Sequence, residues 1–182
     1  MQSFKFQDIN GQEWFRITGS FIGSESELKT ANGTEICRYR KKILSVHSTA
    51  YITINEYEKL NTKRLYQRKT MVVATIKRHS NFSFESSADI YIHNPPVSMA
   101  YVTTIGLPVA IHVEGDITSK KYDFIIGKHN RNPYKIAQVV RKFKLLRYND
   151  YNDSYFIEIG PHVDIAFICF CAYAIDELFS DN

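Results

Sequence analysis

The sequence is poor in cysteines, which cross-link a chain through disulfides, and in the long apolar segments that anchor a chain in a membrane. It has only three cysteines, Cys37, Cys169 and Cys171, among 182 residues. Three cysteines at these positions cannot all pair and do not form a disulfide framework, so we expect free thiols in a reducing compartment. The most apolar segment, residues 165–175, is shorter than the roughly 20 apolar residues of a membrane-spanning helix. No apolar signal core lies near Met1. We therefore expect a cytoplasmic protein.

Motifs of catalysis and metal binding are also missing. The chain has no Gly-x-Ser-x-Gly elbow, no Walker loop and no dinucleotide fingerprint. Its histidines are scattered without metal-ligand spacing, and His93 and His112 fall opposite apolar strand positions, which indicates surface or hydrogen-bonded roles. Asp176 and Glu177 are interpreted as a solvated pair at a helix end, because adjacent helical residues point about 100° apart. We expect no enzyme activity, no metal and no cofactor.

What the sequence does have is the pattern of many short β-strands. Aromatic residues make up 14% of the chain, which favours strands. Asn10-Gly11 and Asn32-Gly33 predict hairpins with type I′ turns. The polar segment 55–69 is interpreted as a loop or short helix. Period-two alternation predicts ten to twelve strands in a single domain over residues 1–182. The expected strands are Ser3–Ile9, Glu13–Thr18, Glu27–Thr30, Thr34–Arg40, Ile43–His47, Tyr51–Ile54, Val72–Lys77, Ala88–His93, Val109–Glu114, Tyr122–Gly127, Tyr134–Phe143 and Tyr155–Ile159.

The last predicted element is a helix that is apolar on every side. The Gly160-Pro161 turn ends the preceding strand, and Asp164 is placed to cap the helix N-terminus. From Ile165 to Ile175 no residue is charged. A helix without a polar face must be surrounded rather than covered on one side. Wide closed barrels can hold a central helix, so we expect a mainly β fold in which a barrel of about twelve strands encloses this helix.

With these elements in place, the chain resembles the LURP-one-related family, which belongs with the tubby C-terminal domain and the phospholipid scramblases. The resemblance implies a twelve-stranded barrel around a central C-terminal helix and a role in stress or defence signalling. Tubby domains bind phosphoinositides through basic residues, so it also implies an anion-binding surface. The matching motifs are Phe6-Gln-Asp-Ile-Asn-Gly11, Phe15-Arg-Ile-Thr-Gly19, Ile36-Cys-Arg-Tyr-Arg-Lys-Lys42, Leu44-Ser-Val-His47, Ile159-Gly-Pro-His-Val-Asp164 and Ile175-Asp-Glu-Leu178.

The basic residues fall in two blocks along the chain. Residues 38–78 hold eleven Lys and Arg against two acids, and residues 117–147 hold nine against one. One interpretation is that these are solvated strand edges, where lysine discourages aggregation. The other is a surface for anionic phospholipid headgroups, each basic residue contributing about 1 kcal/mol. The candidate binding residues are Arg38, Arg40, Lys41, Lys42, Lys128, Arg131, Lys135, Arg141, Lys142 and Lys144.

We therefore expect a non-enzymatic cytosolic binding module that engages phosphoinositide, with a peripheral position at the plasma membrane. Two alternatives stay open. The first is scramblase-like movement of phospholipid, and the second is a DNA-binding or protein-binding regulator. Tyr39 and Tyr66 lie among basic residues and could stack on bases, but no nucleic-acid-binding signature accompanies them.

Overall fold

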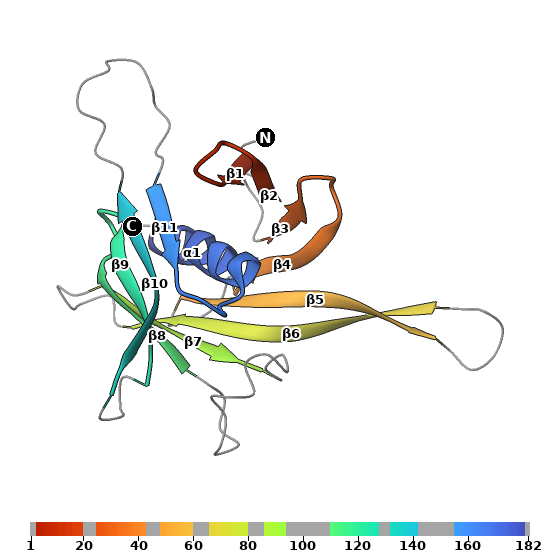
Figure 1. Cartoon of the computed structure of the whole chain (residues 1–182). Helices are drawn as coiled ribbons and strands as arrows, with labels where there is room; N and C mark the ends of the chain where they lie inside the picture. Colours follow the sequence, from red (N-terminus) through yellow and green to blue (C-terminus); the bar gives the residue numbers. More distant parts are fainter. Residues whose placement is uncertain are drawn as a thin grey trace. The chain divides into compact units, whose positions relative to one another are not determined.

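The fold is mainly β, as the sequence predicts. The computed structural model describes residues 3–19, 25–42, 48–59, 66–79, 86–93, 110–127, 132–141 and 155–180 (Figure 1). Within these ranges the chain forms an 11-stranded antiparallel sheet and one C-terminal helix. The elements are β1 Ser3–Gln7, β2 Glu13–Gly19, β3 Glu25–Thr30, β4 Glu35–Lys41, β5 Thr49–Lys59, β6 Tyr66–Arg78, β7 Ser87–Ile92, β8 Ala110–Asp116, β9 Lys121–Ile126, β10 Tyr134–Arg141, β11 Tyr155–Ile159 and α1 Ile165–Phe179.

The hydrogen-bonded order of the strands follows their order in the chain, from β1 to β11. Each strand therefore pairs with the strands before and after it in the sequence. The predicted strand at residues 43–47 lies outside the described residues. Closure of the sheet into a barrel is not part of this hydrogen-bonded order, and it stays a prediction.

The chain divides into two compact units, each with its own buried side chains. The first unit comprises Met1–Lys77 and Tyr91–Pro108, and the second comprises Arg78–Ile90 and Val109–Asn182. Fully or almost fully buried side chains in the first unit include Ile17, Leu28, Ile52 and Ile76. Those of the second unit include Ile90, Ile111, Phe124, Val139 and Phe170. The expectation of one domain over residues 1–182 stays a prediction.

The two Asn-Gly pairs do form hairpin turns, but the predicted turn type is wrong. Gly11 and Gly33 adopt φ values of 83° and 88°, whereas neither preceding asparagine has a positive φ. A type I′ turn needs positive φ at both central residues. Between β3 and β4 the loop is four residues long, and Gly33 N–H donates to the Thr30 carbonyl at 2.9 Å. The longer loop needs only the glycine in the left-handed region.

The interpretation of residues 55–69 as a loop or short helix is wrong over most of the segment. β5 continues to Lys59 and β6 begins at Tyr66, so the two strands form a long hairpin (Figure 1). Its register places Asn55 opposite Thr70 and Glu56 opposite Lys69. Glu56, Lys69 and Thr70 are exposed. At these described positions no side chain is buried, so they lack the apolar alternation by which strands are recognised in a sequence.

Helix α1 has the boundaries and the burial that its composition predicts. The Asp164 side chain accepts a hydrogen bond from the Phe167 N–H at 2.9 Å, which caps the N-terminus. The side chains from Ile168 to Asp176 are all buried, so no face of this stretch is left to solvent. Cys37, Cys169 and Cys171 are buried and none of them forms a disulfide, as expected. Burial is the main reason that the pKa of the Cys169 thiol is raised to about 12.

Candidate functional site

The predicted anion-binding residues are only partly within the described structure. The side chains of Arg38, Arg40, Lys41, Lys42 and Lys135 are described. Arg141 is described only as backbone of β10, and the remaining candidates, Lys128, Arg131, Lys142 and Lys144, lie outside the described residues.

Arg38 and Arg40 lie on the same outward face of β4. They alternate with Cys37 and Tyr39, whose side chains are buried. This follows from the period of two along a strand, which sends residues i and i+2 to one face. Lys41 has the parity of the buried residues, so it does not share this face, whereas Lys42 has the parity of the arginines and follows the strand. The run of basic residues at 38–42 is therefore split between two faces.

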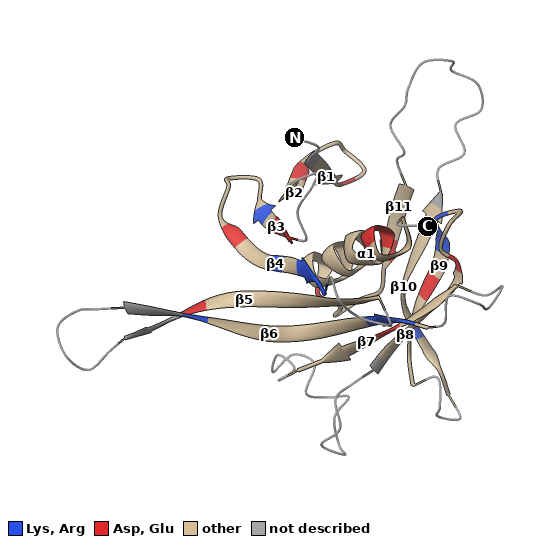
Figure 2. Ribbon diagram, turned by 180° about the vertical axis from the view of Figure 1, so that it is seen from behind, with Lys and Arg blue, Asp and Glu red and all other residues tan. Residues whose placement is uncertain are grey.

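Both arginines are paired with acids from neighbouring positions. Arg40 lies opposite Glu25 in the β3–β4 register and forms an ion pair with its carboxylate. Arg38 lies opposite Glu27, with Nη2 at 2.8 Å from its carboxylate, and also makes a two-point contact with Glu35 at 2.8 Å. Hydrogen bonding to Glu35 is the main reason that the pKa of Arg38 is raised. Figure 2 shows both signs of charge along β3 and β4.

These pairs correct the picture that the basic blocks suggested. The block at residues 38–78 is nearly free of acids along the chain, but β3 brings Glu25 and Glu27 beside it in the sheet. Lys135 of β10 likewise lies 3.4 Å from the Asp123 carboxylate of β9. Segregation of charge along the sequence is therefore not segregation in space for these residues.

The two arginines line a hollow on strands β3 to β6. Its volume is about 320 Å³, and its lining is rich in hydrogen-bonding groups. Thr70 Oγ1 donates a hydrogen bond to Asn55 Oδ1 at 3.2 Å within this lining. Within the described part of the chain, the ion pairs of Arg38 and Arg40 use Nε and Nη2 of each guanidinium group and do not use Nη1. The lining residues are Glu25, Arg38, Tyr39, Arg40, Thr53, Asn55 and Thr70.

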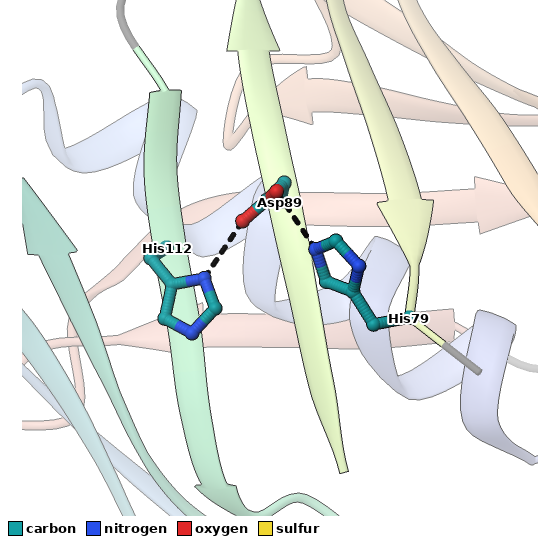
Figure 3. A group of neighbouring side chains, drawn as sticks. All are labelled: His79, Asp89 and His112. Atoms are coloured by element: carbon teal, nitrogen blue, oxygen red, sulfur yellow. Dashed lines mark hydrogen bonds and ion pairs between the residues drawn. The ribbon is translucent and has the colours of Figure 1, made fainter. Parts of the chain in front are cut away.

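A second polar cluster, which the sequence did not single out, lies in the second unit. Asp89 on β7 is placed between two imidazole rings, His79 directly after β6 and His112 on β8 (Figure 3). His112 Nδ1 lies 2.7 Å from Asp89 Oδ1, and His79 Nε2 lies 2.7 Å from Asp89 Oδ2. Each carboxylate oxygen thus accepts from a different ring. His112 Nε2 also lies 3.5 Å from a carboxylate oxygen of Glu114.

The two histidines of this cluster favour the ionised form of the Asp89 carboxylate. Burial of Asp89 raises its pKa, but hydrogen bonds from His112 and His79 outweigh burial, so the pKa is lowered from its ordinary value of 3.8. The predicted hydrogen-bonded roles of His93 and His112 are confirmed, since His93 Nε2 lies 2.8 Å from Thr75 Oγ1. The period-two pattern places Asp89 and His112 on outward faces, but it does not reveal that they meet.

The interpretation of Asp176 as part of a solvated pair is wrong. Asp176 is buried, and Lys120 from the β8–β9 turn reaches its carboxylate at 2.7 Å. Tyr122 and Tyr155 lie in the same region, and burial followed by the charge of Asp176 raises the pKa of both phenols. Tyr122 also donates a long hydrogen bond to the Ala172 carbonyl at 3.4 Å. These contacts fix the C-terminal half of α1 against β9.

Comparison with known proteins assigns the chain to a family. In the described part of the chain, no helix combines the length and the apolar character that crossing a membrane requires. Neither the curated proteins nor the solved structures contain a match. The family model described as LURP-one-related matches residues 1–176, which is nearly the whole chain. This match agrees with the resemblance that the sequence motifs indicated, and the chain belongs to the LURP-one-related family.

Proposed function

We propose that the chain is a non-enzymatic cytosolic module that binds phosphorylated headgroups of anionic phospholipids, phosphoinositides included, at the hollow on β3 to β6. One observation carries the proposal: Arg38 and Arg40 line this hollow together with two threonines and an asparagine. Guanidinium groups bind phosphate through paired N–H donors, and hydroxyl and amide groups complete such sites. The resemblance to phosphoinositide-binding tubby domains points in the same direction.

The acids beside the two arginines define how such a site would work. Each guanidinium has five N–H donors, and Glu25, Glu27 and Glu35 engage only Nε and Nη2. A headgroup phosphate therefore binds through Nη1 and the neighbouring hydroxyl groups. The nearby carboxylates repel a second phosphate and lower the affinity. We accordingly expect weak binding that depends on salt and on a membrane surface, rather than capture of free phosphate.

Flotation with lipid vesicles tests the proposal. Wild-type protein should float with phosphatidylcholine vesicles that contain a phosphoinositide at low salt, and much less of it should float at high salt. The double variant Arg38→Glu, Arg40→Glu removes both arginines of the hollow and should stay in the soluble fraction. A matched control with Lys5→Glu and Lys121→Glu changes the net charge by the same amount at other strands, and it should float like wild type. Equal flotation with pure phosphatidylcholine, or flotation of the double variant Arg38→Glu, Arg40→Glu, would contradict the proposal.

We also propose that the sheet closes into a barrel around α1, as the apolar character of the helix predicts. Support comes from the burial of every side chain from Ile168 to Asp176. In a closed barrel the two end strands of the hydrogen-bonded order, β1 and β11, become neighbours. Cysteine pairs introduced at successive positions of β1 and β11 should then form disulfides in one register. Failure of every pair to cross-link, while a β1–β2 control pair does, would contradict closure.

A further inference from the structure

The His79–Asp89–His112 cluster has the composition and spacing of a metal-binding site. One ligand atom from each residue can be chosen so that all three lie within 4.8 Å of one another. The set combines two imidazole nitrogens with one carboxylate oxygen. We propose that this cluster binds a divalent transition-metal ion of the zinc class. This proposal does not depend on the lipid-binding function.

The ligand types select the class of metal. Imidazole suits zinc, copper, iron, cobalt and nickel, whereas calcium and magnesium prefer sites built from oxygen alone. Three protein ligands with a fourth position for water form the usual arrangement of an open zinc site. His79 has an exposed side chain, at 47%, so the fourth position faces the solvent side of the cluster.

Little movement separates the present geometry from a metal-bound one. Ligands that lie about 2.0–2.2 Å from a tetrahedral zinc ion stand about 3.3 Å from one another. The two nitrogen–oxygen distances are now 2.7 Å, each to a different oxygen of Asp89, so both must lengthen slightly to admit an ion. Asp89 and His112 are largely buried on adjacent strands and supply a fixed pair. His79 follows the end of β6 and is the ligand that can turn toward the ion.

Metal binding requires each imidazole ring to carry its proton on the nitrogen that does not face the metal. Each ring now donates an N–H to Asp89, and the metal takes the lone pair of that same nitrogen. The ring must then carry its proton on the other nitrogen. For His112 this is Nε2, which lies 3.5 Å from a Glu114 carboxylate oxygen. A carboxylate beside the outer nitrogen of a metal-bound histidine fixes the tautomer and raises the basicity of the ligand.

Titration calorimetry with zinc chloride tests the site in tag-free, full-length protein. Wild type should bind one zinc ion, and calcium chloride should give no heat at the same concentrations. His79→Ala and Asp89→Asn should each weaken binding by at least tenfold, in line with the losses seen at metal sites. The matched control is His93→Gln, because His93 is also hydrogen-bonded but to a hydroxyl group, and it should bind zinc like wild type. Circular dichroism establishes that each variant is folded; His79 is exposed, so at least that variant is expected to fold.

Cobalt absorption separates the cluster from the cysteines. Cobalt bound by two histidines and a carboxylate should give visible d–d bands without a sulfur-to-metal charge-transfer band in the near ultraviolet. No zinc binding by wild type overturns the proposal. So does undiminished binding by the His79→Ala, Asp89→Asn double variant, or a sulfur charge-transfer band at one equivalent. Any of these three results would leave the hydrogen-bonded cluster as a structural link between β7 and β8.

Discussion

The enclosure of α1 can be tested by removing side chains from opposite sides of the helix. Ile168 and Phe170 are both 0% exposed. They are two residues apart, so they point about 200° apart around the helix axis. A helix covered on one face cannot bury both side chains. Phe170 also stacks on Tyr173, with ring centroids 6.1 Å apart and planes inclined by 10°.

The structure sets the size of the expected effects. Ile168→Ala should cost about 2–5 kcal/mol and Phe170→Ala about 3–5 kcal/mol, because each leaves a cavity in a packed interior. For a chain of this size each kcal/mol lowers Tm by about 2–4 °C. A domain whose stability exceeds about 5 kcal/mol survives either loss. Phe170→Asp places a carboxylate in the same space and should prevent folding.

Urea denaturation followed by circular dichroism measures these losses. The matched control is Phe156→Ala on β11, where the wild-type residue is 48% exposed. Its expected cost is about 1 kcal/mol. The enclosure of α1 is refuted if either Ile168→Ala or Phe170→Ala costs no more than this control. A soluble Phe170→Asp variant that unfolds cooperatively would refute it as well.

Three further predictions concern individual contacts. The pKa of Asp89 is lowered in the folded chain, so the carboxylate's contribution to stability is present above the ordinary value of 3.8 and is lost as pH falls through the folded pKa. The urea midpoint of wild type should therefore drop between about pH 5 and pH 2, and Asp89→Asn should make that drop smaller. An unchanged drop in the variant would contradict this prediction. Lys120→Met takes one cation away from the buried Asp176 carboxylate and should cost up to about 3–5 kcal/mol, most of which a second change, Asp176→Asn, should restore in a double-mutant cycle. Gly115 has a φ of 131°, and an added Cβ there would lie 2.7 Å from a backbone oxygen. At Gly33 no atom lies within 4 Å of an added Cβ, and only about 1 kcal/mol of left-handed strain is expected. Gly115→Ala should therefore lower Tm more than Gly33→Ala.

The strands and the helix were predictable because burial leaves a pattern in the sequence. Where one face of a strand is buried, as at Ala88, Ile90 and Ile92 of β7, apolar residues alternate with polar ones. The pattern fails where the register shifts. Alternation along β6 would place Val72 on the buried face with Ala74, but a shift in pairing between Ile52 and Thr53 of β5 leaves Val72 41% exposed.

The sites were less predictable because they depend on which strands are neighbours. Asp89 and His112 are 23 residues apart, and Arg40 and Glu25 are 15 residues apart. Alternation assigns each of these residues to a face without saying what lies beside it. Because this sheet keeps chain order, a search for polar residues on the same face of consecutive strands would have found the Asp89–His112 pair. The burial of Asp176 had no such signal, since it depends on a lysine in a turn.

The order of elements along the chain has a consequence for synthesis. Every described strand precedes α1, and because neighbours in the sheet are neighbours in the chain, we expect each strand to be able to pair with its predecessor once both have emerged from the ribosome. The side chains that contact the helix, such as Tyr122 on β9, are made about 50 residues before their partner Ala172. During that interval the growing chain has hairpins whose apolar faces lack α1. We expect this stage, rather than the pairing of strands, to be the period of greatest exposure to aggregation and to chaperones.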